Sequence, residues 1–532
     1  MMDPVVDPEG NSYERNAIIA WLKQNSNSPI TRSPLRIDQL IPNRSLRKAI
    51  EDEIANGTLA RSNARSDSKH ESKTVEEIGP SGLKSSPEPL DPVRLTITSG
   101  GLVSEVSDDG SVAVRVMTSI IPPDSSTRCP ADVVCVVDVS GSMGGNASLP
   151  GATEFSGLSL LDIVKHALKT IINTLQPDDR FALISYSDVA KVVFCLTPLN
   201  GAGKARALSL IESLEPDGLT NLWDGLLKGM DVLAASRSPA ADIRNCCLLL
   251  LTDGVPNVDI AVEGGGMYAF IPDSGFVGTA FVNALSNQLV SFGTQAFLSL
   301  EWQLDDERDV IGNPNCSFAS WGTNIDIGNL HYGQRRDFVV RLKVPRDLVT
   351  SSDCLVSATL KYKTLPVNDG SVAAVPGTDE VILTSEIWDN SPQQHVEAEV
   401  QWLRCRLVDF ISERMDEGVS PNSPADSVLA QEMRTWLHAH ALGKRDVDEG
   451  KAVARVEGLL QDLTGQITEA VSKEQYFCRW GMHYLPSLQR AHALQQCNNF
   501  KDPGIQFYGG SLFTSVRDVA DDVFCSMPPP QP

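Results

Sequence analysis

Residues 131–142 read A-D-V-V-C-V-V-D-V-S-G-S. The unbroken apolar run between Asp132 and Asp138 is typical of a strand that is buried on both faces, as in parallel sheets. After it, helical and strand patterns alternate along the chain. Helices are expected over 158–175, 202–214 and 222–235, and strands over 181–186, 192–196 and 246–251. Strands that alternate with helices predict a doubly wound α/β domain, to which we assign residues 131–293.

Oxygen-bearing side chains gather where these strands end. The first strand runs into the loop Asp138-Val139-Ser140-Gly141-Ser142, Thr220 lies in a later loop, and Asp253 follows the strand at 246–251. All three segments are expected at or near the carboxyl edge of the sheet, where open α/β folds bind ligands. Carboxylate and hydroxyl oxygens are hard ligands that suit Mg²⁺ or Mn²⁺.

These three segments, in this order, resemble the metal-ion-dependent adhesion site of von Willebrand factor A domains. The resemblance implies that five residues hold Mg²⁺ or Mn²⁺: Asp138, Ser140, Ser142, Thr220 and Asp253. An ion with few charged ligands keeps its Lewis acidity, so that it can take a carboxylate from a protein substrate as its remaining ligand.

The chain departs from that family after Asp253. In the family, a further strand and helix come before a Gly-Gly-x-Tyr segment, but here only twelve residues, Val255 to Gly266, follow Gly254 before Met267 and Tyr268 of the segment G-G-G-M-Y-A-F at 264–270. A parallel crossover alone takes about a dozen residues. We therefore expect one β-α unit to be missing, through exon skipping or a wrongly placed intron, and the sheet to be narrowed beside Asp253. A helix over 276–292 is expected to close the domain.

The first 57 residues contain no cysteine and are too short to bury a comfortable core. They lack the ligands for a structural zinc ion, so hydrogen bonds, ion pairs and a compact apolar cluster must hold the fold. Helices are expected over 14–24 and 45–56. The expected cluster comprises Val5 or Val6, Tyr13, Ile18, Trp21, Leu22, Leu35, Leu40, Leu46 and Ile50.

Three blocks in this segment, 1–22, S-P-I-T-R-S-P-L at 28–35 and L-I-P-N-R-S-L-R-K-A-I at 40–50, resemble the U-box of ubiquitin ligases. The resemblance implies a RING-like domain without zinc that docks a ubiquitin-conjugating enzyme charged with ubiquitin. Trp21 and Pro29 would contact that enzyme, and Arg32 would reach ubiquitin, where a planar cation with several donors suits two acceptors. Catalysis would come from positioning, without a covalent intermediate on the ligase.

U-boxes normally begin some residues earlier, with a Cys-Pro-Ile-like stretch that supplies a first docking contact. We therefore expect an N-terminally incomplete U-box over 1–57. Either the gene model begins too late or docking is weakened.

Composition limits the partners. The net charge of the 532 residues is −23, which argues against nucleic acid because phosphate binding needs clustered Lys and Arg. No apolar run reaches the length of a membrane helix, and the N-terminus does not resemble a signal peptide, which favours the cytosol or nucleus. Eleven cysteines, an odd number, fit reduced thiols better than a disulfide framework.

The rest of the chain completes a multidomain α+β protein. Residues 58–92 have the composition of a disordered linker. Strand patterns over 93–130 are expected to complete a β-sandwich formed mainly by 294–388. Helical patterns dominate 389–500, and 501–532 is expected to be a C-terminal tail.

Two functions remain open. In the first, the chain is a ubiquitin-protein ligase whose U-box recruits the charged conjugating enzyme while the von Willebrand factor A-like domain holds the substrate. In the second, it is a metal-dependent binding scaffold with an inactive U-box.

Overall fold

The computed structural model divides the chain into two compact units, residues 1–85 and 86–532. The structure describes residues 4–6, 12–14, 18–19, 22–23, 34–42, 93–106, 111–147, 157–236, 244–253, 261, 264–271, 274–302, 308–312, 316–319, 322–345, 356–365, 380–385, 388–389, 392–419, 423–441, 447–528 and 530. The predicted linker at 58–92 and the helix at 45–56 lie outside these residues.

The first unit contains a three-stranded antiparallel sheet in the order β2-β1-β3, with β1 at Pro4–Val6, β2 at Ser12–Glu14 and β3 at Ile41–Pro42. A 3-10 helix, η1, spans Ile37–Gln39. Ile18 and Leu35 are buried and pack with Leu22 and Leu40, so four members of the predicted apolar cluster do meet. The predicted start of the first helix at Glu14 is wrong, because Glu14 pairs with Pro4 and extends the hairpin.

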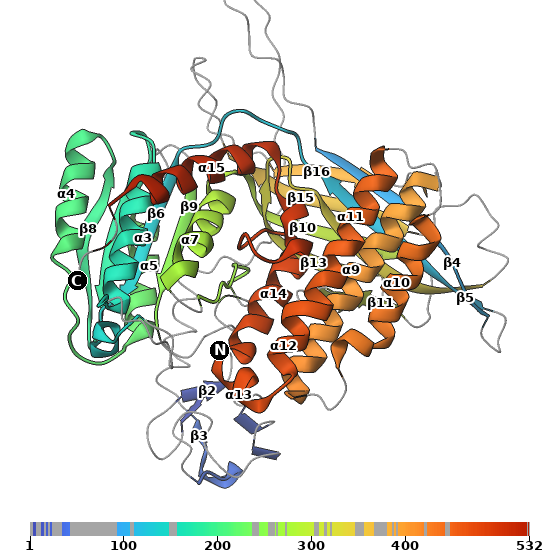
Figure 1. Ribbon diagram of the computed structural model, residues 1–532, viewed down its shortest axis with the longest axis horizontal. Helices are drawn as coiled ribbons and strands as arrows, with labels where there is room; N and C mark the ends of the chain where they lie inside the picture. Colours follow the sequence, from blue (N-terminus) through green and yellow to red (C-terminus); the bar gives the residue numbers. More distant parts are fainter. Residues whose placement is uncertain are drawn as a thin grey trace, which may run out of the picture. The chain divides into compact units, whose positions relative to one another are not determined.

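A four-stranded mixed sheet in the order β8-β7-β6-β9 forms the core of the α/β region (Figure 1). Strands β7 (Arg180–Tyr186) and β9 (Asn245–Leu251) run parallel to the central β6 (Ala131–Asp138). The edge strand β8 (Ala190–Pro198) runs antiparallel to β7. The sequence predicted these strands but not the reversed direction of β8.

Helices cover both faces of this sheet. Alternate side chains of β6, such as Val133 and Val137, pack with α3 (Leu160–Thr174), α4 (Gly201–Glu212) and α7 (Ser274–Leu289). The intervening side chains, Val134 and Val136, pack with α5 (Leu222–Ser236). This alternation explains the unbroken apolar run, since β6 is buried from both sides.

The closing helix is shorter than predicted. It ends at Leu289, and β10 (Ser291–Trp302) begins two residues later. Ser291 pairs with His331, and Phe292 packs in the core of the β-sheet region, so the helical pattern does not continue to 292. The described residues between β9 and α7 form no strand. The loss of a β-α unit stays a prediction.

Two five-stranded sheets share one hydrophobic core. One has the order β12-β13-β10-β15-β16, and the other has the order β11-β14-β5-β4-β17. The remaining strands are β4 (Arg94–Val106), β5 (Ser111–Ile121), β11 (Arg308–Ile311), β12 (Cys316–Ala319), β13 (Gly322–His331), β14 (Arg336–Pro345), β15 (Val356–Thr364), β16 (Glu380–Ser385) and β17 (Trp388–Asp389). Strands β4 and β5 precede the α/β region in sequence, yet β5 pairs along its length with β14, which follows it.

Helices form the C-terminal part, as predicted. They are α9 (Pro392–Glu417), η3 (Pro424–Asp426), α10 (Val428–Ala441), α11 (Val447–Asp462), the π-helical turn η4 (Leu463–Ile467), α12 (Thr468–Val471), α13 (Glu474–Tyr476), a second π-helical turn η5 (Phe477–Gly481), α14 (Met482–Leu494), η6 (Pro503–Tyr508) and α15 (Ser511–Ser526). None of the helices in the described part of the chain is both long and apolar enough to cross a membrane.

The prediction of a tail over 501–532 is wrong for most of its length. Helix α15 buries Leu512, Phe513 and Ala520, and it lies across α7 and α3 (Figure 1). Its Phe524 ring meets His166 edge-on at 4.8 Å, and Gly278 leaves room for that ring. The C-terminal helix therefore packs directly on the α/β region.

Candidate metal centre

Two loops meet at the carboxyl edge of the four-stranded sheet. The loop after β6 enters a 3-10 turn, η2 (Gly141–Gly144). Gly141 N–H donates to the Gly218 carbonyl at 3.0 Å, and Asp217 N–H donates to the Val139 carbonyl at 2.7 Å. Gly218 has φ +75°, a conformation that residues with a Cβ rarely adopt, so glycine is needed where the loops touch.

Asp138 is completely buried at the end of β6. Its Oδ1 accepts a hydrogen bond from Ser140 N–H at 2.8 Å. Its Oδ2 accepts from the Thr252 hydroxyl at 2.9 Å and from the Tyr186 hydroxyl at 3.2 Å. Burial raises the pKa of Tyr186 well above its usual value, so that this hydroxyl stays a neutral donor. The Asp138 carboxylate is thus held by three donors, none of which is charged.

Hydrogen bonds connect three other predicted ligands to Asp138, one after another. The Ser140 and Ser142 Oγ atoms are 3.0 Å apart, and the Ser142 hydroxyl donates to Asp253 Oδ1 at 3.1 Å. Desolvation is the largest influence on Asp253 and raises its pKa, the Ser142 hydrogen bond lowers it, and the charge of Asp138 raises it. The structure therefore brings four of the five predicted ligands into one chain of contacts.

Thr220, the fifth predicted ligand, is exposed two residues after Gly218. Its loop adjoins the loop of Ser140 and Ser142, but no hydrogen bond joins Thr220 to the other four ligands within the described ranges.

Tyr186 and Thr252 were not predicted as part of the site. Tyr186 lies opposite Asp138 in the β6–β7 register, and Thr252 precedes Asp253. Both are polar residues at the ends of the strands on either side of β6. Their positions could have indicated that they belong to the site, but the prediction considered only the residues of the motif.

The donor set fits a hard divalent cation. It consists of carboxylate oxygens from Asp138 and Asp253 and hydroxyl oxygens from Ser140 and Ser142. Mg²⁺ and Mn²⁺ prefer such oxygen ligands. Across the described segments, no Lys or Arg forms an ion pair with either carboxylate.

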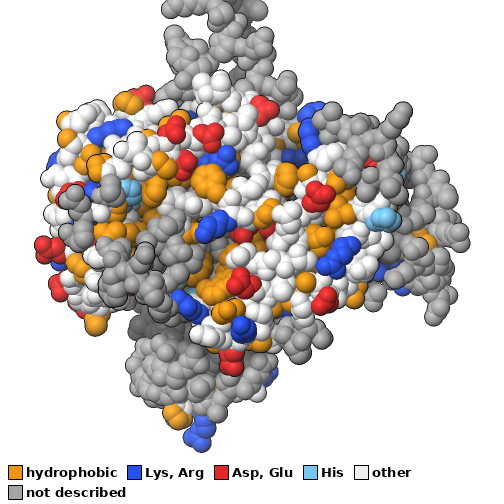
Figure 2. Space-filling model, in the orientation of Figure 1, with side chains coloured by type: hydrophobic (Ala, Val, Ile, Leu, Met, Phe, Trp, Pro, Cys, Tyr) orange, Lys and Arg blue, Asp and Glu red, His pale blue; other side chains and the backbone are white. Residues whose placement is uncertain are grey.

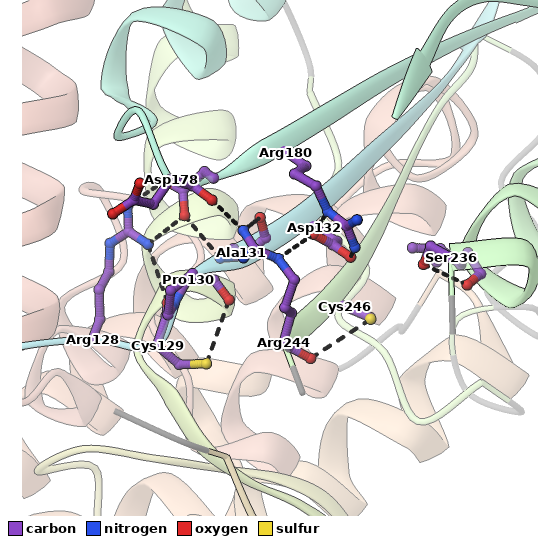
Figure 3. A network of polar contacts seen from close by, with 12 residues as sticks. Arg128, Cys129, Pro130, Ala131, Asp132, Asp178, Arg180, Ser236, Arg244 and Cys246 are labelled. Atoms are coloured by element: carbon purple, nitrogen blue, oxygen red, sulfur yellow. Dashed lines mark hydrogen bonds and ion pairs between the residues drawn. The ribbon is translucent and has the colours of Figure 1, made fainter. Parts of the chain in front are cut away.

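The opposite end of the sheet is built differently (Figure 3). Asp132, at the start of β6, accepts from Arg180 Nε at 2.8 Å and from Arg244 Nε at 2.7 Å. Nearby, Asp179 accepts hydrogen bonds from both terminal nitrogens of Arg128. These carboxylates are neutralised by arginines, so this end offers no comparable site for a cation.

Trp21, Pro29 and Arg32, the residues predicted to contact the conjugating enzyme and ubiquitin, lie outside the described residues. Their roles stay predictions.

Three family models match the chain. The U-box domain matches residues 1–56, the von Willebrand factor type A domain matches 133–255, and a model described as "VWA / Hh protein intein-like" matches 453–522. The last match covers most of the C-terminal helices from α11 to α15 and was not predicted.

Curated relatives match only parts of the chain. It is 30% identical over 139 residues, 26% of its length, to inter-alpha-trypsin inhibitor heavy chain H3 of Homo sapiens, and this covers 14% of that protein. It is 46% identical over 52 residues, 10% of its length, to U-box domain-containing protein 34 of Arabidopsis thaliana, and this covers 6% of that protein.

Solved structures with low sequence identity cover more of the chain. A von Willebrand factor type A protein from Catenulispora acidiphila has a TM-score of 0.45 at 13% identity, covering 77% of this chain and 98% of its own. The ArnB paralog VWA2 from Sulfolobus acidocaldarius has a TM-score of 0.42 at 12% identity, covering 75% and 99%. The two family models over residues 1–56 and 133–255 show that the chain carries a U-box domain at its N-terminus and a von Willebrand factor type A domain after it.

Proposed function

We propose that this chain is a ubiquitin-protein ligase. The observation that carries the proposal is the match of residues 1–56 to the U-box model, together with 46% identity over 52 residues to a plant U-box protein. A U-box docks a ubiquitin-conjugating enzyme and promotes transfer of ubiquitin from its thioester to a lysine. The cytosol or nucleus, where such enzymes act, is the compartment that the proposal requires.

The U-box acts by positioning. Trp21 and Pro29 contact the conjugating enzyme, and Arg32 bridges to ubiquitin, so that the thioester is held in a reactive arrangement. Holding reactants in place lowers the barrier without any bond between ubiquitin and the ligase. The chain needs no catalytic nucleophile of its own.

The von Willebrand factor type A domain holds the substrate. Asp138, Ser140, Ser142 and Asp253 supply the oxygen cluster, and Thr220 lies on the adjoining loop. Mg²⁺ or Mn²⁺ bound there supplies a Lewis-acidic position for an anionic ligand. A carboxylate of the substrate protein is the natural ligand for that position, since the partner is a protein and the cation is hard.

Discharge of ubiquitin from a charged conjugating enzyme to free lysine tests the ligase proposal. Arg32→Ala is expected to slow discharge by about tenfold to a hundredfold at saturating conjugating enzyme, because a small loss of positioning has a large effect on rate. Lys23→Ala is the matched control, since Lys23 is an exposed cation of the same unit outside the three motif blocks.

A rate for Arg32→Ala equal to that of the wild type would remove the positioning mechanism. No discharge by the wild-type chain with any conjugating enzyme, alongside intact metal-dependent binding, would instead identify a binding scaffold with an inactive U-box.

A further inference from the structure

Five large apolar side chains are exposed together on the α/β region. The exposed fractions are 74% for Leu219, 61% for Trp223, 59% for Val189, 43% for Met230 and 39% for Leu227. Figure 2 shows one face of the molecule, on which apolar side chains are interspersed with charged ones. A concentration of exposed apolar side chains, including a tryptophan, is typical of an interaction surface.

The five residues form one surface. Trp223, Leu227 and Met230 are spaced four and three residues apart, so they share one face of α5. The start of α5 is tied to the turn between β7 and β8 through Ala190 N–H, which donates to Asp224 Oδ2 at 2.6 Å. Val189 is therefore beside the start of this stripe. We call Val189, Leu219, Trp223, Leu227 and Met230 the α5 apolar surface.

The fold does not need this face of α5. The other face carries Gly225 and Gly229, which let the helix approach the sheet closely. A Cβ at Gly225 would lie 2.6 Å from the Tyr186 ring, and one at Gly229 would lie 2.6 Å from Val136. These contacts fix the rotation of α5 about its axis and leave the apolar stripe facing away from the sheet.

The surface is continuous with the candidate metal centre. Leu219 and Thr220 follow Gly218, whose carbonyl accepts from Gly141 N–H in the Ser140–Ser142 loop. Asn221 N–H then donates to the Ser187 carbonyl at 2.7 Å, which anchors the other end of the same loop. Leu219 therefore lies on the loop that touches the oxygen cluster, and Trp223 follows at the start of α5.

We propose that the α5 apolar surface binds the segment of a substrate protein that follows or precedes the carboxylate held at the metal centre. The partner is a peptide segment with an acidic side chain close to aromatic or aliphatic side chains. This inference rests on the proposed metal-dependent capture of a substrate. The acidic side chain of this peptide follows from charge complementarity, because a cation attracts a carboxylate. Its aromatic or aliphatic side chains follow from the apolar character of the five residues on the surface.

A second copy of the chain fits this surface less well. Stable dimers bury roughly 20–30 residues a side, whereas this surface consists of one helix face and two adjoining turns. A short peptide segment matches its size and its position beside a single ligand site.

Selection from a phage-displayed library of random peptides, about a dozen residues long, tests the inference on the full chain. In millimolar Mg²⁺, selected peptides are expected to carry Asp or Glu within a few residues of aromatic or aliphatic side chains. Trp223→Ser and Leu219→Ser are each expected to weaken binding of these peptides by about tenfold or more, as for a central aromatic or apolar contact. Val519→Ser, which alters a residue 53% exposed on α15, is the matched control and is expected to bind like the wild type.

Calorimetric titration of Mg²⁺ on the same samples separates the possible failures. If Mg²⁺ binds but Trp223→Ser and Leu219→Ser both bind the peptides like the wild type, or no peptide with this motif is selected, the inference is overturned and the proposed function stands. If Mg²⁺ does not bind, the metal-dependent part of the proposed function fails and takes the inference with it. Light scattering that shows a dimer converted to a monomer by Trp223→Ser would assign the surface to self-association and overturn the inference.

Discussion

The two ends of strand β6 carry buried aspartates with opposite surroundings. Asp132, at the amino end, forms ion pairs with Arg180 and Arg244 (Figure 3). Asp138, at the carboxyl end, accepts from one amide and two hydroxyl groups among the residues that the structure describes. Both side chains are buried to within 1% of complete.

We propose that this difference separates a carboxylate that stabilises the fold from one that binds a cation. Arginine is always charged, so it neutralises Asp132 permanently. Asp132 is therefore not available to bind a cation. Neutral donors orient Asp138 without cancelling its charge, which leaves a local negative potential for a cation to satisfy. The carboxyl end of the sheet is also where open α/β folds place their ligands.

Asp132→Asn is expected to have the largest effect on stability. It leaves two arginines without their carboxylate, and breaking a buried pair by removing one partner costs about 3 kcal/mol of unfolding free energy. The affinity for Mg²⁺ is expected to stay unchanged, because Asp132 lies at the other end of the strand. Urea denaturation gives the first quantity and calorimetric titration the second.

Glu212→Gln is the control for that experiment. Glu212 pairs with Lys169 at 2.5 Å, but its side chain is 59% exposed. An exposed pair contributes about 1 kcal/mol at most. A loss as large as that of Asp132→Asn would mean that burial does not distinguish the two pairs.

Asp138→Asn is expected to abolish stabilisation by Mg²⁺. At a free concentration of about 100 times its Kd, a ligand stabilises the folded state by about 2.7 kcal/mol. The variant should keep much of its stability without metal, because asparagine preserves the shape of the side chain and one carbonyl acceptor. Melting curves in chelator and in Mg²⁺ provide the measurement.

Asp231→Asn, which changes an exposed carboxylate on α5, should retain the full Mg²⁺ response. Identical melting curves for the wild type with and without Mg²⁺ would contradict a cation site at Asp138.

The sequence predicted the side-chain cluster at the carboxyl end of β6 better than the ion pairs at its amino end. The five predicted ligands lie in short motifs whose order along the chain is itself a signal, and four of them meet in the structure. Tyr186 was missed because its contact with Asp138 depends on the register between β6 and β7. The arginine partners of Asp132 were missed because Arg180 and Arg244 are 48 and 112 residues away from it.

In the fold as well, features that follow from local sequence were predicted, and features that depend on distant contacts were missed. The strands and helices of the α/β region follow local apolar patterns and were predicted nearly to their ends. Helix α15 was missed because Pro503, Gly504, Gly509 and Gly510 indicate an irregular segment. Its apolar face is buried by packing on α7 and α3, which the local sequence does not show. The direction of β8 was also not predicted, since an apolar pattern carries no direction.

A third buried carboxylate, Asp462, forms no ion pair with an arginine and belongs to no group of cation ligands within the described part of the chain. It is 2% exposed at the end of α11 and accepts from Gly504 N–H at 3.0 Å. His492 Nε2 lies 3.3 Å from its Oδ2, and the Tyr508 hydroxyl is 2.7 Å from His492 Nδ1. Burial raises the pKa of Asp462 to about 8 and lowers the pKa of His492 to about 3, so both groups are neutral near pH 7. A bound proton neutralises Asp462, whereas arginines neutralise Asp132.

This difference predicts a dependence of stability on pH. The unfolded pKa of Asp is about 3.9, so between that value and about 8 the folded state holds a proton that the unfolded state has lost, and stability falls as pH rises. His492 contributes with the opposite sign, but only up to its unfolded pKa of about 6.5. Asp502, which accepts from the Tyr484 hydroxyl, has a pKa raised to about 6 by burial and contributes below that value.

The window from about pH 6.5 to about 8 therefore isolates Asp462 within this cluster. One proton gives a slope of at most about 1.4 kcal/mol per pH unit. Asp462→Asn carries no titrating group, so its unfolding free energy should fall less steeply than that of the wild type across the window. Urea denaturation at several pH values measures both slopes. Equal slopes would mean that Asp462 is already ionised in the folded state, and that its surroundings resemble those of Asp138 more closely than its burial suggests.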